Sequence, residues 1–175
     1  MFDNVVIGVS DHEDGRDAVA LARQLVSATG RLTLVHARVI GREPSGDPRD
    51  GRHGLDALEA LREETRIGAH VSSVKALSVA HGLHTYARVQ RADLIVVGAG
   101  TRSVLHRAPC AVAIAPIGFA SATRPLEDVA VAHDGAGAQD ALADDPDTPL
   151  LVLRAAPQRA GAIKNLNSER SVRSR

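Results

Sequence analysis

The sequence predicts an α/β protein built on an open, doubly wound, five-stranded parallel sheet of the Rossmann-like kind. Apolar runs of strand length alternate along the chain with segments whose apolar residues recur at helical spacing. Runs such as 94–97 are continuously apolar, which is typical of strands covered on both faces. Aromatic residues make up 2% of the chain, so the core is expected to consist of Ala, Val, Leu and Ile.

The first thirty residues predict one strand and one helix. Residues 4–9 form a short, mostly β-branched run that reads as a buried strand. The acidic stretch 11–14 suits a helix start. Apolar side chains at helical spacing then predict a helix over 16–29 that Gly30 ends: Ala18, Leu21, Ala22, Leu25 and Val26.

The same alternation continues to residue 115. Stretch 41–53 is rich in Gly, Pro and charge and is expected to be a mobile loop. The remaining helices are expected at 55–68, 79–87 and, as two turns at most, 101–107. The remaining strands are expected at 32–39, 70–77, 94–97 and 110–115.

The link between the fourth and fifth strands is unusually short. Residues 99–108 lie between two strand-like runs, whereas a parallel crossover usually needs about a dozen residues including a helix. In an α/β nucleotide fold this is also where a Gly-rich turn holds phosphates. The segment that would bind a ligand is therefore reduced to a minimum.

After Ile117 the pattern starts again in a shortened form. Residues 126–135 echo 2–11, and 148–157 echo 108–116, with a short helical piece at 138–143. We therefore divide the chain into an α/β domain at 1–120, a truncated second repeat at 121–157 that keeps its first and last strands, and a disordered tail at 158–175. Chance similarity between valine-rich strands is the alternative.

Charge and cysteine content limit the partners and the cellular location that the sequence predicts. Lys plus Arg and Asp plus Glu number 21 each, so nothing attracts the chain generally to nucleic acid or to an anionic membrane. No basic segment followed by a long apolar run marks a secretion signal or a membrane span, which predicts a cytoplasmic location. The single cysteine, Cys110, lies in an apolar strand and is expected to be a buried, inert thiol.

In the order and spacing of several short motifs the chain resembles the universal stress proteins, in particular those with two tandem domains. The resemblance covers 2–120 well and 126–157 in part. It implies the fold expected above and a role in stress response. The matching segments are 5–9, 15–22, 32–37, 82–84, 92–98 and 108–112.

The resemblance also implies where ATP would bind. ATP-binding members carry a glycine loop after the fourth strand; Gly98 matches its first glycine, Gly100 and Thr101 match its end, and the stretch between is missing. The family's Asp after the first strand falls on Ser10 or, with a one-residue slip, on Asp11. The backbone of Ala37 to Val39 matches the adenine contact. ATP is therefore expected to bind weakly or not at all at these candidate residues, which are Ser10, Asp11, Ala37, Val39, Gly98, Gly100 and Thr101.

Other candidate chemistry is weaker. Residues 10–14 could form a metal or acid–base site, but a helix cap with solvated acids is favoured. His81 and His84 share a helix face without a third ligand at clear spacing, and His106 and Arg107 could meet an anion near Gly100. No catalytic triad, zinc pattern or intact phosphate loop is present in the sequence.

The sequence thus predicts a protein that is not an enzyme and needs no cofactor. It would act in stress response through contacts with unknown protein partners, and would form a homodimer through its last strand. The alternative is an adenine-nucleotide-binding stress protein with residual affinity. The apolar strands 110–115 and 150–153 are expected to pair, within one chain or across a dimer, because an unpaired apolar strand invites aggregation.

Overall fold

The computed structural model describes residues 1–10, 12–41, 50–122, 130–133 and 150–153. Its sheet has the strand order β3-β2-β1-β4-β5-β7-β6, and the first five strands are mutually parallel. The predicted open, doubly wound, five-stranded parallel sheet is therefore confirmed. The elements are β1 (Phe2–Gly8), α1 (His12–Leu25), β2 (Val26–Val39), α2 (Asp50–Thr65), β3 (Ala69–Ala76), α3 (Val79–Gln90), β4 (Leu94–Gly98), η1 (Ala99–Leu105), β5 (Ala111–Ala115), η2 (Phe119–Ser121), β6 (Ala130–His133) and β7 (Leu150–Leu153).

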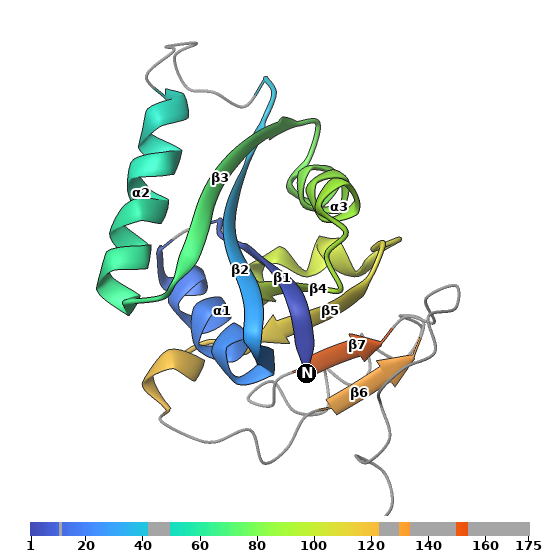
Figure 1. Ribbon diagram of the computed structural model, residues 1–175. Helices are drawn as coiled ribbons and strands as arrows, with labels where there is room; N and C mark the ends of the chain where they lie inside the picture. Colours follow the sequence, from blue (N-terminus) through green and yellow to red (C-terminus); the bar gives the residue numbers. More distant parts are fainter. Residues whose placement is uncertain (11, 42–49, 123–129, 134–149, 154–175) are drawn as a thin grey trace, which may run out of the picture.

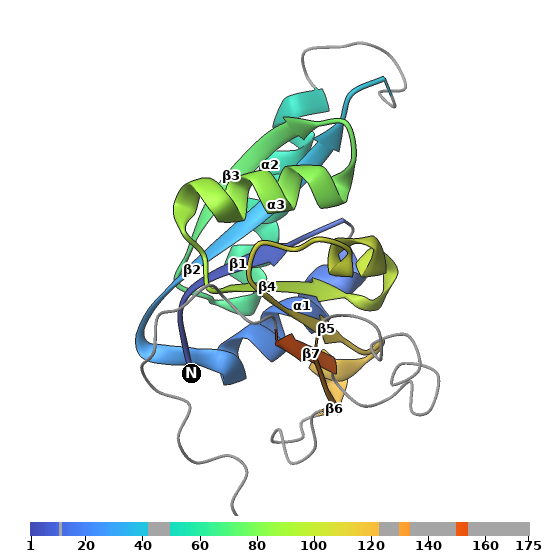
Figure 2. The ribbon, with the colours of Figure 1, turned by 90° about the vertical axis from the view of Figure 1, so that its right-hand side faces the viewer.

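Helices cover both faces of the parallel sheet. Helices α1 and α2 lie on one side, and α3 lies on the other, as Figure 1 shows. The view in Figure 2 shows α3 lying across the face formed by β2 and β3. The short 3₁₀ helix η1 packs on the same face as α3.

Alternate residues of each central strand feed two separate cores. In β4, Leu94 and Val96 pack toward α1 and α2, whereas Ile95 and Val97 pack toward α3 and η1. All four side chains are fully buried. This two-sided burial explains why the strand is continuously apolar in sequence.

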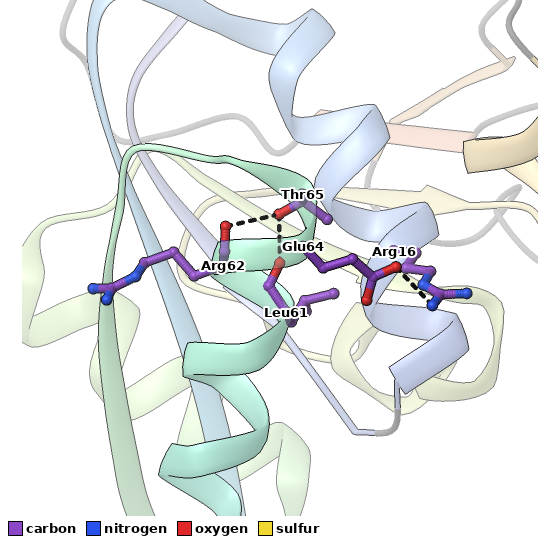
Figure 3. Close-up of polar contacts among 5 residues, drawn as sticks. All are labelled: Arg16, Leu61, Arg62, Glu64 and Thr65. Carbon is purple, nitrogen blue, oxygen red and sulfur yellow. Dashed lines mark hydrogen bonds and ion pairs between the residues drawn. The ribbon is translucent and has the colours of Figure 1, made fainter.

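Helices α1 and α2 also meet through polar groups (Figure 3). Arg16 pairs with Glu64 at 2.6 Å, but both side chains are about half exposed, so the pair contributes little stability. The Thr65 hydroxyl, at the last residue of α2, donates to the carbonyl of Leu61 at 2.6 Å within the last turn of the helix. The guanidinium of Arg23 donates to the Thr65 carbonyl and ties the two helix ends together.

The first helix ends earlier than the sequence predicts. Helix α1 stops at Leu25, and Val26 begins β2 by pairing with Phe2, so the expected helix over 16–29 is wrong beyond Leu25. A register shift follows between Phe2 and Asn4. Gly30 lies inside this irregular stretch, where a Cβ atom would come within 3.0 Å of the Phe2 carbonyl oxygen. The glycine allows this close approach rather than ending a helix.

Two further boundaries differ. Helix α2 starts at Asp50, inside the stretch 41–53 that was expected to be a loop, and it ends at Thr65 rather than near Gly68. The expected α-helix over 101–107 is instead the 3₁₀ helix η1, which starts at Ala99 and is kinked at Thr101. A 3₁₀ helix rises more per residue than an α-helix, which suits a crossover that has few residues to span the sheet.

Beyond the parallel sheet, the predicted pairing of the two apolar strands is present within one chain. Strand β7 runs antiparallel to β5, with Val112 opposite Val152 and Ile114 opposite Leu150. Strand β6 then pairs with β7 in parallel. The helical piece expected at 138–143 and the tail expected at 158–175 lie outside the described residues.

Cys110 precedes β5 and is buried, with 9% of its surface exposed. Burial, and secondarily the negative charge of Asp93, raises the pKa of the thiol from 9.0 to about 12. The thiol should therefore react with a thiolate-selective disulfide reagent far more slowly at pH 8 in the folded protein than in denaturant. Labelling at the rate of a free thiol in the folded state would contradict this burial.

The same pKa shift sets a pH dependence of stability. Because the folded state holds the proton more tightly than the unfolded state, this contribution to stability is fully present below pH 9.0 and is lost as pH rises toward about 12. Denaturant melts between these two pH values should show a smaller loss for Cys110→Ser than for the native chain.

Candidate functional site

The candidate site lies where β1 and β4 end side by side. After β1 the chain enters α1 on one face of the sheet, and after β4 it enters η1 on the opposite face. Such a divergence of neighbouring parallel strands creates the crevice in which α/β proteins bind ligands. The residues gathered here are Ser10, Asp14, Gly98, Gly100 and Thr101.

The Asp14 side chain lies directly over the two glycines. A Cβ atom on Gly98 would lie 2.8 Å from Asp14 Cβ, 2.9 Å from its Cγ and 2.9 Å from its carbonyl oxygen. A Cβ atom on Gly100 would clash with Asp14 Oδ2. The two glycines therefore let the Asp14 side chain come close to the backbone of Gly98 and Gly100. A bound phosphate would need to come equally close to the same backbone.

Weak hydrogen bonds link the end of β1 to the start of η1. Thr101 Oγ1 donates to Ser10 Oγ at 3.3 Å, and Ser10 Oγ lies 3.5 Å from Asp14 Oδ2, where it is a donor. Thr101 is buried, at 7% exposure, whereas Ser10 is exposed. The hydroxyl groups of Thr101 and Ser10 and the carboxylate of Asp14 therefore form hydrogen bonds with one another.

The residues expected near adenine lie farther along the sheet. Ala37 and Val39 are on β2, two strands away from β4 and therefore roughly 10 Å from it. Ala37 is buried under α3, since a Cβ atom on Gly82 would lie 2.9 Å from Ala37 Cβ. Asp11 lies outside the described residues.

The histidines and the His106–Arg107 pair do not lie at this crevice. His84 Nε2 donates to the carbonyl of Val104 at 2.8 Å and so joins α3 to η1, while His81 is exposed. His106 and Arg107 follow the far end of η1 from Gly100. Within the described residues no group of three or more His, Cys, Asp or Glu side chains could hold a metal ion. No described helix is long and apolar enough to cross a membrane.

No pattern in the sequence assigned a role to Asp17, which is a buried acid of α1. It is buried, with 6% exposure, and its two carboxylate oxygens accept hydrogen bonds from the backbone N–H groups of Gly118 and Ala120, each at 2.8 Å. It thereby fixes η2 against α1. One signal was present in the sequence: Asp17 stands four residues before Leu21, on the apolar stripe of the helix.

Comparison with known proteins gives structural likeness only. No family model and no curated protein sequence matches the chain. The fold is similar to a universal stress protein family structure from Burkholderia pseudomallei, with 24% identity, a TM-score of 0.47, and 64% of this chain and 94% of that chain covered. It is also similar to a universal stress protein from Archaeoglobus fulgidus, with 18% identity, a TM-score of 0.45, and 66% and 99% covered.

A third similar structure is a universal stress protein in complex with cAMP, with 20% identity, a TM-score of 0.40, and 87% of this chain and 97% of that chain covered. All three are universal stress protein family structures, and at these identities the likeness is one of fold alone.

Proposed function

We propose that this chain is a cytoplasmic stress-response protein of the universal stress protein type whose ATP-binding site is degraded. It acts through contacts with other proteins and catalyses no reaction. The observation that carries the proposal is the position of Asp14, whose carboxylate lies over Gly98 and Gly100.

A carboxylate at this place opposes a triphosphate in two ways. It fills the space that phosphate oxygens would need against the two glycines. It also repels them, since two like unit charges about 4 Å apart near a protein surface repel by about 4 kcal/mol, which is roughly a thousandfold in affinity. The residues present therefore do not fit ATP as the resemblance would have it bind.

The link between β4 and β5 supports the same proposal, because its length is about what a crossover alone needs. Twelve residues, from Ala99 to Cys110, join β4 to β5, and seven of them form η1. A glycine loop that wraps a triphosphate would have to come from this same stretch. With η1 packed against α3, the link is used to cover the sheet.

Residual nucleotide affinity is the second candidate function. It is favoured by the gathering of Ser10, Gly98, Gly100 and Thr101 at the crevice, where the resemblance puts the ligand. A nucleoside or a nucleotide with fewer phosphates would meet less repulsion from Asp14 than ATP does.

The nucleotide content of the purified protein distinguishes the two candidates. Protein purified without added nucleotide is denatured, and the released adenine nucleotide is measured by chromatography. We expect an amount far below one molecule per chain. Adenine nucleotide released in near-equal amount to the protein would overturn the degraded-site proposal and support the second candidate.

We also propose that 121–157 is a truncated second copy of the domain. When Pro109 is set against Pro149, Val112 corresponds to Val152, and these two residues stand opposite each other between β5 and β7. Antiparallel pairing that brings equivalent residues face to face is what a two-fold relation between two copies produces. The proposed second copy then serves to cover the β5 edge.

The expected homodimer is likewise a proposal. Within one chain β7 already pairs with β5. A dimer through the last strand of the domain therefore requires that β7 be displaced, or exchanged between the two chains.

A further inference from the structure

Four arginines line the amino-terminal edge of the parallel sheet. Arg31 lies beside Asn4 of β1, where the continuous pairing of β2 with β1 begins after the register shift. Arg66, Arg91 and Arg107 follow α2, α3 and η1, and each precedes the next strand. All four are exposed. This edge is opposite to the one that carries Asp14 and the two glycines, so the two features are separate.

The four guanidinium groups form no ion pair with any residue in the described part of the chain. Two acids at this edge accept hydrogen bonds from other groups. Asp93 accepts from the backbone N–H groups of Asp3 and Asn4 at 2.7 and 3.0 Å, and Asp3 accepts from the Ser27 hydroxyl at 2.6 Å. Glu63, in the last turn of α2, is a further exposed acid. The edge therefore carries four guanidinium groups against three carboxylates, and its guanidinium groups are left without an ion-pair partner among the described residues.

Three of these arginines occupy a backbone conformation that favours glycine. The φ angles are 51° at Arg66, 54° at Arg91 and 58° at Arg107, and no other described non-glycine residue has a positive φ. A positive charge near a helix C-terminus is favourable, but this effect does not explain the arginines at positive φ. Helices α2 and α3 already carry Arg62 and Arg88 in their last turns. Arginine at the same point of three crossovers is an outlier that points to function.

We propose that this edge, defined by Arg31, Arg66, Arg91 and Arg107, is a docking surface for a carboxylate-rich segment of a partner protein. The inference rests on the proposed function, namely action through protein contacts, and names the chemistry of the partner. A guanidinium group matches a carboxylate with two parallel hydrogen bonds. With strands about 4.8 Å apart, the outer arginines span roughly 20 Å, which an extended peptide of about six residues covers.

Nucleic acid fits this surface less well. Aromatic residues on which bases could stack make up 2% of the chain.

The test measures binding of fluorescein-labelled poly-L-glutamate by fluorescence anisotropy at low salt. The combined variant Arg66→Gly, Arg91→Gly and Arg107→Gly removes three charges and puts glycine where glycine is favoured. The native chain should bind, and the variant should bind at least about tenfold more weakly, as three exposed ion pairs would give. Its melting temperature should be unchanged or higher, because the backbone N–H of Arg91 keeps its bonds to Ala87 and Arg88.

Control variants separate position from charge. Arg102→Ala removes one exposed arginine from η1 near the other end of the sheet and should leave binding unchanged. Arg91→Gln and Arg107→Gln remove the charge but keep a side chain at a residue of positive φ. They should weaken binding as the glycine variants do.

Three results would overturn the proposal: no binding of poly-L-glutamate by the native chain, unchanged binding by the combined glycine variant, or displacement of the peptide by inorganic polyphosphate at lower concentration than by unlabelled poly-L-glutamate. The last would assign the edge to phosphate polyanions. None of these results changes the nucleotide content of the purified protein, so failure here is distinguishable from failure of the degraded-site proposal.

Discussion

Replacing Asp17 with alanine should lower the free energy of unfolding by about 3 kcal/mol, because a hydrogen bond to a charged acceptor contributes about 1.5–3 kcal/mol and Asp17 accepts two. Solvent screens the carboxylate little, since it is 6% exposed. The loss leaves the N–H groups of Gly118 and Ala120 without their acceptor and releases η2 from α1. Chemical denaturation measures the effect.

Two variants control this experiment. Asp56→Ala makes the same charge change at an exposed position of α2 and should change stability by no more than about 0.5 kcal/mol. Asp17→Asn keeps one acceptor oxygen and should fall between Asp17→Ala and the native chain. Equal denaturation midpoints for Asp17→Ala and Asp56→Ala would show that the two hydrogen bonds from Gly118 and Ala120 to Asp17 contribute no stability.

Truncation after Ala122 should make the protein associate. It removes β7 and leaves the edge of β5 unpaired at Val112, Ala113 and Ile114, and an apolar edge strand pairs with other chains. Light scattering after size-exclusion chromatography should detect a larger average mass, relative to the mass of one chain, than the full chain shows at the same concentration. The melting temperature should also fall.

Deletion of 158–175 alone is the matched control, because it shortens the chain and leaves β6 and β7 in place. It should behave like the full chain. In the full chain, hydrogen exchange should be slow at Leu151 and Val152. If the longer truncation also behaves like the full chain and exchange at these residues is fast, then β7 does not protect the β5 edge.

The strands could be predicted from the sequence because their burial is two-sided. A run such as 94–97 must be apolar at every position when alternate side chains enter different cores. Its short length and β-branched residues favour a strand over a buried helix. The end of α1 could not be predicted in the same way. Val26 fits a helical stripe and also fits a strand, and its pairing with Phe2 decides between them.

The candidate site could be predicted in its members but not in its arrangement. Ser10, Gly98, Gly100 and Thr101 follow strand ends, and strand order brings such ends together. The sequence grouped Asp14 with its neighbours as a solvated helix cap. That its side chain turns over Gly98 depends on how α1 packs beside β4, which is a tertiary contact without a local signal. The partners of Asp17 are likewise about a hundred residues away.

Titration calorimetry with ATP and magnesium tests the degraded site most directly, when the native chain is compared with Asp14→Ala and with the control Asp56→Ala. The account predicts no heat of binding for the native chain and for Asp56→Ala at ligand concentrations up to about 1 mM, where the binding free energy would be about −4 kcal/mol. Asp14→Ala, which removes the carboxylate from Gly98 and Gly100, should bind more tightly than either. Micromolar binding by the native chain that persists when substitutions fill the space at these glycines would contradict the account. Weaker binding by Asp14→Ala than by the native chain would contradict it as well.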